Sequence, residues 1–376
     1  MKMQIHYKHN MSLNNTGISR TTEKCFTNIE LVTNICKFLN YGQQFQLSKV
    51  SRELNHIIVN FVWKLKFKEV EILIFHKTTD NLVSDRIDIQ ANNLLSVTKQ
   101  CDIISKQSTF LKTNELEIFL NLNVYNINKL QLITANDHCE RVIVKFPLKQ
   151  NFKNLNYLSY VRITLASEDL QKLADNCLKL ETLVMCNCLN REGQTLVLDN
   201  DIDIQIIKNM RNLKNLIIKD SNEGSDNRQH LYTISNIEHI LNQTKLQCLN
   251  INVHILPDSN TLKKELTVNN LKCCTNFQIG RFVECSNFID FQTNILENFE
   301  NLKNLYLSGY KFRTNITTDL FNILLKSCEN LTNLTLDQCR IMDFIALPKL
   351  QHLSLRSCQG LTFINLKTML NEMHLI

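Results

Sequence analysis

Cysteine is the residue type in this chain with the most obvious chemical potential, because a thiolate can bind a metal or attack a substrate. The sequence holds 14 cysteines, and two close pairs stand out, Cys186-x-Cys188 and Cys273-Cys274. A zinc site needs a tetrahedron of ligands, usually supplied by two separated pairs of regular spacing. Neither close pair has a second pair at such a spacing. The sequence therefore predicts no metal site, and it indicates no other cofactor.

The other residues that could support catalysis form no recognisable arrangement. The 10 histidines are scattered, and none lies in an H-E-x-x-H motif or in a known nucleophile motif. Phosphate-binding loops of the G-x-x-x-x-G-K-S/T or G-x-G-x-x-G type are missing, and only 7 glycines are present. A Cys–His pair that meets only in the folded chain stays open as an alternative. The pattern favours a protein that is not an enzyme.

Most cysteines instead belong to a repeated pattern of leucines. It is clearest at Leu331–Cys339 (LTNLTLDQC) and Leu350–Cys358 (LQHLSLRSC), which both read L-x-x-L-x-L-x-x-C. The last two leucines lie two residues apart, so in a β-strand they point to the same side, towards a core. A small, fairly apolar cysteine suits the narrow interior at the end of such a unit. This spacing is typical of a leucine-rich repeat, and because one unit cannot bury its own apolar face, copies must stack into a solenoid.

Further copies run through the second half of the chain, at spacings around the ~20–29 residues usual for this repeat. Between them, apolar residues follow helical spacing, as in 170–177 and 320–328. In both segments a cysteine, Cys177 or Cys328, ends the predicted helix shortly before the strand leucine. The last gap is short and predicts a loop in place of a helix. The copies start at Leu155, Leu180, Leu213, Leu246, Val268, Leu302, Leu331 and Leu350.

Residues 66–150 carry a weaker version of the pattern. Val70–Ile74 alternates like a strand, and 119–124 and 130–133 read as divergent copies. We interpret 66–150 as a divergent or capping start of the solenoid, because terminal repeats are often atypical. Residues 151–376 form the clear repeats. The polar residues 1–24 lack periodicity and predict a disordered tail.

Residues 25–65 show apolar spacing of a different kind, typical of short helices. Apolar residues recur at helical intervals over 29–39, and the Asn-Tyr-Gly sequence at 40–42 predicts a break. A second set runs from Phe45 to Ile58, again with helical spacing, and Trp63 closes the segment. Short helices totalling about forty residues make a poor core by themselves. They need the neighbouring repeats or another protein to pack against.

This segment resembles an F-box. The family pattern is roughly L-P-x-E-L-L-x-x-I-F-x-Y-L, a short turn, D-L-x-x-L-x-x-V-C-x-x-W and a later Trp, and the chain aligns with it without a gap. The matches are Glu30, Leu31, Val32, Ile35, Phe38, Leu39, Leu47, Val50 and Trp63. The departures are Asn28 for Pro, Gln43-Gln44 for Asp-Leu, Ser51 for Cys and Leu54 for the first Trp. With cysteine-containing repeats after it, the chain is similar to the F-box/leucine-rich-repeat family.

The resemblance implies a substrate-receptor subunit of a Skp–cullin–F-box ubiquitin ligase, which does no chemistry itself. Its N-terminal helices would bind a Skp-family adaptor and, through it, a cullin, while the repeats would bind an unknown target protein. The implied fold is α/β, with a short helical F-box-like unit followed by a leucine-rich-repeat solenoid, strands on the concave side and helices on the convex side. The adaptor-binding residues implied by the motif are Ile29, Leu31, Ile35, Phe38, Leu39, Leu47, Val50 and Trp63.

The target surface follows from the geometry of a strand, in which residues alternating with the buried leucines face the concave side. Ile217 and Tyr306 are apolar or aromatic where water is expected, which makes them candidate binding hot spots. Isolated exposed apolar residues are also common without any role, and that alternative stays open. The predicted target-binding residues are Thr182, Val184, Lys214, Asn215, Ile217, Asn304, Tyr306, Thr335, His352, Ser354 and Arg356.

Charge and composition narrow the remaining alternatives. The formal net charge is +6, but the basic residues are dispersed, which indicates a solvated surface and disfavours nucleic-acid binding. The start of the chain does not read as a signal peptide, and no run approaches the ~18 apolar residues of a membrane span. We therefore expect no membrane association, a reducing cytoplasmic or nuclear location, and free thiols. The alternative function is a leucine-rich-repeat scaffold without a ligase, whose N-terminal helices are only a cap.

Overall fold

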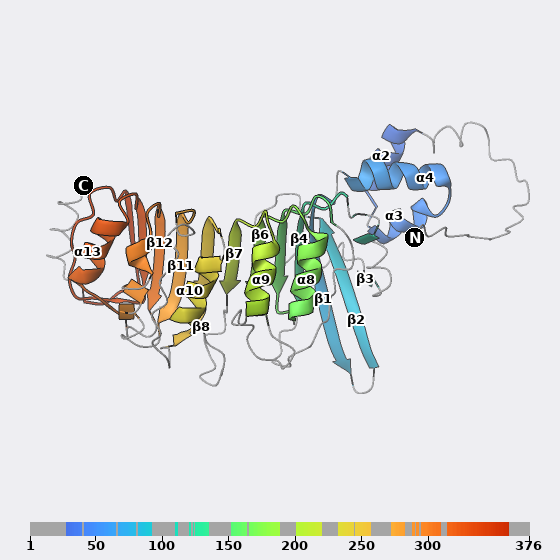
Figure 1. The fold of residues 1–376 in the computed structure, drawn as a ribbon. Coiled ribbons are helices and arrows are strands. Elements are labelled where there is room, and N and C mark those ends of the chain that lie inside the picture. The colour runs from blue at the N-terminus through green and yellow to red at the C-terminus, as the bar shows by residue number, and fades with distance from the viewer. Residues whose placement is uncertain are drawn as a thin grey trace, which may run out of the picture.

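The structure is a computed structural model that describes residues 28–39, 41–64, 67–79, 82–91, 110–111, 120–121, 123, 125–134, 152–163, 165–188, 201–219, 232–243, 245–256, 272–282, 288–289, 291–292, 295–309 and 314–360. The predicted disordered tail, residues 1–24, lies outside them. The architecture of the described residues is α/β. Short helices form the N-terminal unit, and one large, mostly parallel sheet forms the rest (Figure 1).

The N-terminal unit is helical, as its apolar spacing predicted, and a break separates its first two helices close to the predicted place, since α2 ends at Lys37 and α3 starts at Tyr41. Gly42 itself lies inside α3, and a second break, which was not predicted, lies near Ser51. The Oγ atom of Ser51 accepts a hydrogen bond from the backbone N–H of Leu54 at 3.1 Å, so a new helix starts there. The elements are α2 (Ile29–Lys37), α3 (Tyr41–Ser48), α4 (Arg52–Ile57) and the π-helix η1 (Ile58–Trp63). We call residues 28–64 the helical unit.

The sheet grows by parallel strands that are neighbours in chain order, as in a solenoid. Each new strand pairs with the one before it, so the sheet extends in one direction from β1 (Glu69–Thr79). Nine parallel strands follow β1 in the described part: β4 (Lys129–Thr134), β5 (Tyr157–Val161), β6 (Thr182–Cys186), β7 (Asn215–Lys219), β9 (Cys248–Asn252), β11 (Asn276–Phe282), β12 (Asn304–Gly309), β14 (Asn333–Asp337) and β16 (His352–Arg356).

The N-terminal end of the sheet is built differently. β1 pairs antiparallel with β2 (Leu82–Ala91), which pairs antiparallel with β3 (Phe110–Leu111). Only Glu69–Ile74 of β1 pairs with β4, so the hairpin extends past the sheet (Figure 1). The strands predicted at 70–74 and 130–133 are confirmed. The divergent copy predicted at 119–124 is wrong, because Leu120 and Asn121 are helical.

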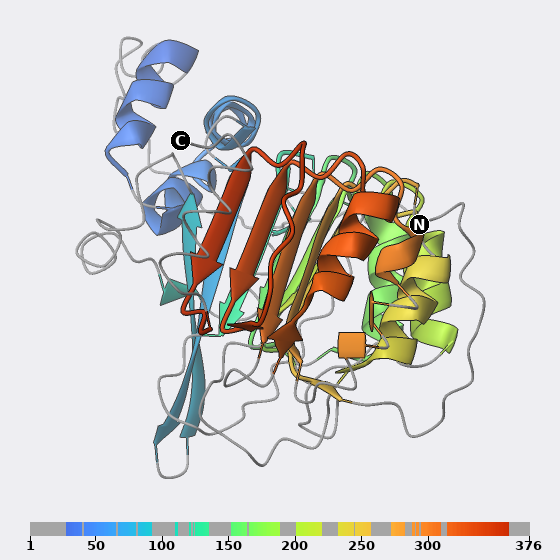
Figure 2. The same ribbon diagram turned by 90° about the vertical axis from the view of Figure 1, so that its left-hand side faces the viewer.

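Helices cover one face of the sheet, which we call the helix face (Figure 2). No described helix covers the opposite face, which we call the open face. Cys177 and Cys328 are the C-cap residues of two covering helices, so both predicted helix ends are confirmed. The elements on and around the helix face are α8 (Ser167–Asn176), α9 (Asp201–Asn209), α10 (Ile234–Gln243), α13 (Thr318–Ser327), the 3-10 helix η3 (Leu296–Asn298), and the short strands β8 (Tyr232–Thr233), β10 (Ile255–Leu256), β13 (Asn315–Ile316) and β15 (Arg340–Ile341).

The connection between β14 and β16 contains β15 and no described helix, as the short last gap predicted. None of the described helices combines the length and the apolar character that a membrane span requires.

The core lies between the sheet and its helices, and the predicted leucines build it. Leu183 and Leu216 are in register on β6 and β7 and fully buried. The copy predicted at Val268–Cys273 is wrong, because Phe277 of β11 occupies the leucine position in register with Leu249 of β9. A ring fits there because other aromatic residues surround it: Phe291 lies 5.9 Å and Phe299 5.0 Å from Phe277, between ring centroids.

Asparagines tie four of the turns before strands, those before β5, β7, β12 and β14, to the turn before the preceding strand. The turns before the strands form the edge of the sheet where the strands begin, which we call the leading edge. Each bond joins two successive units of the stack, which fixes their spacing on this edge. The side-chain amides of Asn154, Asn212, Asn301 and Asn330 donate to the backbone carbonyls of Tyr125, Leu178, Lys272 and Glu300, at 2.7, 2.7, 2.9 and 3.2 Å.

Candidate protein-interaction surfaces

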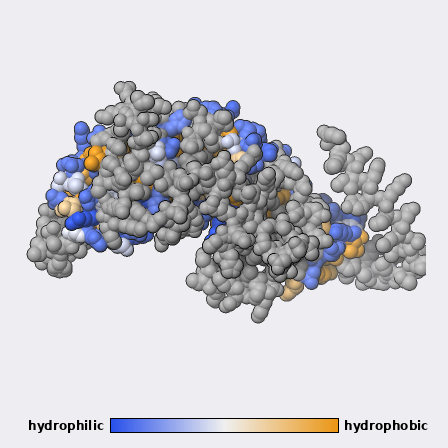
Figure 3. All heavy atoms as spheres, turned by 90° about the horizontal axis from the view of Figure 1, so that it is seen from below, coloured by the Kyte–Doolittle hydropathy of each residue, from blue (hydrophilic) through white to orange (hydrophobic). Residues whose placement is uncertain are grey.

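Helix α2 carries apolar residues on two faces, and only one of these faces is buried. Val32 and Cys36 point into the helical unit and are buried. Leu31, Ile35 and Phe38, spaced i, i+4 and i+7, are 39%, 39% and 88% exposed. We call these three residues the α2 stripe. Apolar residues exposed in a row along a helix are the kind of surface that a partner covers, and Figure 3 shows apolar surface, in orange, on the N-terminal helices.

Most other residues predicted to bind the adaptor are at least partly accessible. Ile29 at the start of α2 is exposed, and Val50 in the turn after α3 is 72% exposed. Leu39 and Leu47 are half-buried, and Leu47 packs against the core. Phe61 of η1 is exposed and was missed, because the family pattern has no position for it.

Trp63 was also predicted to contact the adaptor, and the structure corrects that role. Its side chain is fully buried, and its indole N–H donates to Oε1 of Gln44 at 2.9 Å. Gln44 is fully buried too, and its Nε2 donates to the carbonyl oxygens of Cys36 and Leu39 at 2.7 and 2.8 Å. One amide therefore joins α2, α3 and η1 through three hydrogen bonds. Trp63 supports the helical unit from inside and does not line its surface.

The departures from the F-box pattern have local structural roles. Asn28 accepts a hydrogen bond from the backbone N–H of Leu31 at 3.0 Å and caps α2. Ser51 caps α4, Gln44 is the buried link, and Leu54 is buried in the core. These residues stabilise the helical unit and leave the α2 stripe on its surface.

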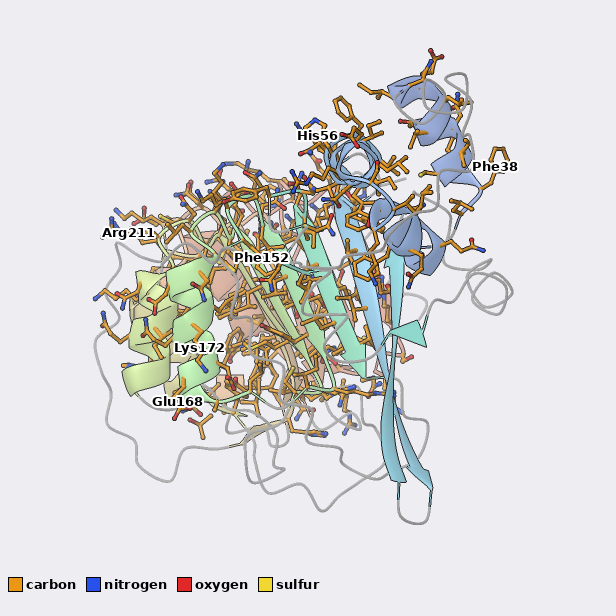
Figure 4. The ribbon with its side chains drawn as sticks, turned by 90° about the vertical axis from the view of Figure 1, so that its right-hand side faces the viewer. Phe38, His56, Phe152, Glu168, Lys172 and Arg211 are labelled. Atoms are coloured by element: carbon orange, nitrogen blue, oxygen red, sulfur yellow. The ribbon has the colours of Figure 1, made fainter. Side chains whose placement is uncertain are left out.

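The helical unit packs on the first strand of the sheet. The backbone N–H of Phe67 donates to the carbonyl of Trp63 at 2.8 Å, and the two rings meet edge to face with centroids 6.1 Å apart. The unit therefore sits at the β1 end of the stack (Figure 1). Figures 2 and 4 both show it displaced towards the open face, away from the helices of the helix face.

The residues predicted to bind a target lie in two groups on the open face, separated by β9 and β11. In the first group, Val184 and Ile217 are in register and half-buried, so they form a small apolar pair. Lys214 is a correction, because it precedes β7 and pairs with Glu181 at 2.8 Å on the leading edge. The first group is Thr182, Val184, Asn215 and Ile217, and the second is Asn304, Tyr306, Thr335, His352, Ser354 and Arg356.

Two of the predicted asparagines bond to neighbouring strands. The amide of Asn215 donates to Oγ1 of Thr182 at 2.9 Å. Asn304 donates to Oδ1 of Asn276 and accepts from the amide of Asn333. These side chains form rows along the open face, perpendicular to the strands. Their amides are already engaged in the stack, so they order the surface before any target arrives.

Tyr306 anchors a polar group at the C-terminal end of the open face. Its hydroxyl donates to Oδ2 of Asp337 at 2.7 Å. Burial, and then the hydrogen bond that the hydroxyl donates to Asp337, raise the pKa of Tyr306 to about 12, so the hydroxyl remains a donor at neutral pH. Thr335 and Ser354 are in register with Tyr306, and Arg356 is in register with Asp337. Tyr306 is therefore half-buried and bonded, which differs from the exposed ring predicted.

Asn250 and Gln278 lie between the two groups and were missed. The amide of Asn250 donates to Oε1 of Gln278 at 2.5 Å. Asn250 could have been predicted from the sequence. It follows Leu249 on β9, and in a strand the residue next to a buried leucine faces the opposite side of the sheet. Gln278 was not predicted to face the open side, because the repeat that contains β11 was predicted at Val268–Cys273, several residues before the observed strand.

The cysteines of the described residues are free thiols. Burial raises the pKa of five of them to about 12, which keeps them protonated and poor as nucleophiles or ligands at neutral pH. These five are Cys177, Cys188, Cys274, Cys328 and Cys339. Within the described residues, no group of three or more His, Cys, Asp or Glu side chains could hold a metal ion.

Comparison with known proteins adds no family to this picture. No protein-family model matches the chain, and no curated protein matches it.

Proposed function

We propose that this chain is the substrate receptor of a Skp–cullin–F-box ubiquitin ligase. The helical unit would be the F-box that binds a Skp-family adaptor, and the repeats would be leucine-rich repeats that bind a target protein. The chain would act by proximity, because holding the target near a ubiquitin-charged enzyme raises its effective concentration there. The observation that carries the proposal is the α2 stripe, an exposed apolar row on a helix whose opposite face is already buried.

The size of the stripe is sufficient for a binding hot spot. Burying a Phe or Leu side chain fully contributes roughly 1.5–3 kcal/mol. Phe38 is 88% exposed, so nearly all of that free energy is available to a partner. Leu31 and Ile35 would each contribute a smaller part, since each is 39% exposed. Together they could supply several kcal/mol, about the share that a few hot-spot residues give to an interface.

Co-purification with a Skp-family adaptor tests the proposal. The wild-type chain should co-purify, and a variant with Ile35→Asp and Phe38→Asp should not, because two carboxylates would enter the apolar contact. The matched control is Leu325→Asp with Met342→Asp, which changes two exposed apolar residues far along the chain. This control should bind the adaptor as the wild type does.

Two results would count against the proposal. If the folded wild type does not bind the adaptor, the ligase role fails. If the stripe variant still binds, the contact lies elsewhere on the chain. Fluorescence of Trp63, which is the only tryptophan, shows in every case whether the helical unit is folded.

The open face can be tested separately. Changing Ile217→Asp and Tyr306→Asp should abolish capture of a target and leave adaptor binding intact, because neither residue belongs to the helical unit. Unchanged capture of a target would remove these two residues from the binding surface.

One observation favours the alternative of a scaffold without a ligase. Trp63 and Phe67 join the helical unit to the sheet, as a cap would be joined. A cap must cover the end of a stack, but it does not need an exposed apolar stripe. The adaptor experiment therefore separates the two functions.

A further inference from the structure

A row of basic residues follows the leading edge. Lys153, Lys179, Arg211 and Lys245 occupy the turns before β5, β6, β7 and β9, one residue in each successive turn, and all four are exposed. We call them the basic row. Figure 4 shows Arg211 on the upper edge of the sheet, the edge on which His56 of the helical unit also lies. Bonds between turns hold three of these residues in line, because Lys179 donates to Oδ1 of Asn154 at 3.1 Å and Asn212 donates to the carbonyl of Leu178 at 2.7 Å.

The basic row is not neutralised by the carboxylates close to it. None of its four residues pairs with a carboxylate of the described residues. Three glutamates of the leading edge pair with other lysines instead, so these three charges are compensated without the row. These pairs are Glu69–Lys129 at 2.8 Å, Glu181–Lys214 at 2.8 Å and Glu300–Lys272 at 3.1 Å.

Helix dipoles explain only part of this arrangement. Cations near the C-terminal end of a helix are stabilising, but the effect falls off within the last turn. Lys179 lies beyond the C-cap Cys177 of α8, and Arg211 lies beyond the end of α9. The helix face has the opposite balance at α8, which carries Glu168, Asp169 and Asp175 against one lysine. The basic row and the acidic surface of α8 therefore lie on different sides of the molecule.

We propose that the basic row binds an acidic segment of the target polypeptide. This inference rests on the proposed function, because it gives the target of the repeats a chemical character. A single-stranded nucleic acid would need aromatic rings on which its bases stack. Among the described turns, the exposed ring near the row is Tyr125, and the ammonium of Lys153 lies over it, 5.2 Å from its centroid. An acidic peptide needs only the cations.

The length of the row sets the length of the segment. Adjacent strands lie about 4.8 Å apart, so four successive turns span about 14 Å. An extended chain advances about 3.3 Å per residue, so four or five residues cover the row. A stretch of that length with alternating or successive carboxylates can meet every cation of the row.

The test uses the full chain without adaptor and measures fluorescence anisotropy. The probe is a labelled peptide of about 12 residues that alternates Glu and Ser, long enough to cover the row. We expect it to bind, more weakly as salt is added, while the same peptide with Gln in place of Glu should not bind. The edge variant carries Lys153→Gln, Lys179→Gln, Arg211→Gln and Lys245→Gln. The matched control removes the same charge elsewhere through Lys64→Gln, Lys172→Gln, Lys326→Gln and Arg340→Gln.

The edge variant should weaken binding about tenfold or more, because an exposed ion pair contributes a factor of about two. The control should bind within about twofold of the wild type. Equal weakening in both variants would show attraction by net charge alone and would overturn the proposal. Failure of the peptide to bind, or tighter binding of an oligothymidylate strand, would overturn it as well.

The outcome is independent of the adaptor experiment. A chain that binds the acidic peptide but not the adaptor keeps the basic row and loses the ligase role. A chain that binds the adaptor but not the peptide loses only the basic row. Thermal unfolding of both variants shows whether they are folded, and if the edge variant is not, Arg211→Gln with Lys245→Gln repeats the test with half the charge removed.

Discussion

The helical unit and the repeat sheet use their apolar residues in different ways. In the sheet, the inward side chains of one strand pack on those of the next, and residues such as Leu183 and Leu216 have no exposed surface. In the helical unit, α2 buries Val32 and leaves Ile35 and Phe38 to solvent. The inward side chains of the sheet are covered by neighbouring strands and helices, whereas the helical unit leaves the α2 stripe uncovered. This difference is the basis of the proposal that the helical unit binds an adaptor.

The two regions also differ in how polar side chains support them. The sheet uses the same kind of hydrogen bond in several units. An asparagine directly before the first leucine of a repeat bonds to the previous turn, as at Asn212 and Asn301. The helical unit depends on one buried residue, Gln44, with three hydrogen bonds. The sheet should therefore tolerate the loss of one asparagine bond better than the helical unit tolerates the loss of Gln44.

The largest expected effect contrasts a core leucine with a stripe leucine. Leu216→Ala should lower the free energy of unfolding by about 2–5 kcal/mol, because it leaves a cavity in the core. Leu31→Ala should change it by about 0.5 kcal/mol or less, because its side chain is partly exposed and a surface change of this kind is usually that small. Urea unfolding followed by circular dichroism measures both. Equal losses would mean that the stripe is core, and the contrast between the regions would fail.

Gln44→Leu tests the single support of the helical unit. It removes three hydrogen bonds from buried groups and should cost about 1–3 kcal/mol in the stability of the helical unit. Trp63 fluorescence should report this loss, while circular dichroism of the sheet changes less. Gln46→Leu is the control, because Gln46 is exposed on the same helix. If both signals shift together, the helical unit and the sheet unfold as one body.

Alkaline pH should act mainly on the sheet, where the buried thiols with a raised pKa lie. Burial raises the pKa of Cys177 and Cys328 from 9.0 to about 12, so the folded state holds protons that the unfolded state releases. The stability from these thiols is fully present below pH 9 and is lost as pH rises towards 12, by about 1.4 kcal/mol per thiol per pH unit. Urea unfolding at about pH 8 and pH 10 should show a shallower loss in a Cys177→Ala, Cys328→Ala variant. An identical loss would exclude these thiols as its cause.

The smallest effect concerns one bond of the repeated support. Asn212→Ala removes the hydrogen bond to the carbonyl of Leu178 and should cost about 0.5–1.5 kcal/mol. Asn212→Asp keeps the shape but loses the donor, so its loss should be similar. Thermal unfolding measures both. No change in either variant would show that the turns are held without this bond.

Local patterns in the sequence predicted much of the fold. Apolar residues two positions apart, most of them leucines, predicted the inward faces of β6, β7, β12 and β14, and these residues are buried. The helix ends at Cys177 and Cys328 are confirmed. The apolar spacing of 29–39 predicted α2, and most of the residues that the resemblance to an F-box marked for adaptor binding are accessible. Strand faces and helix ends depend on residues a few positions apart in the chain, and the sequence shows these residues directly.

Other features depended on contacts between distant residues. The position of β11 was missed because Phe277 fills a leucine position, and only the rings packed around it make that choice possible. Trp63 matched the late Trp of the F-box pattern, which predicted contact with an adaptor. Its side chain is buried instead, and its indole N–H donates a hydrogen bond to the buried side chain of Gln44. Asn212 looked like an ordinary loop residue, yet it bonds to a carbonyl 34 positions earlier.

The sequence by itself determined the alternation of strands and helices, and with it the parallel stack, because strand and helix periods are local properties of the chain. Only the tertiary structure decided that Trp63 is buried and which asparagines join the turns. It also decided that Lys153, Lys179, Arg211 and Lys245 form one row, although they look dispersed along the chain. The physical reason is that stacking brings residues from separate repeats to within a few ångströms, and one-dimensional spacing does not encode that proximity.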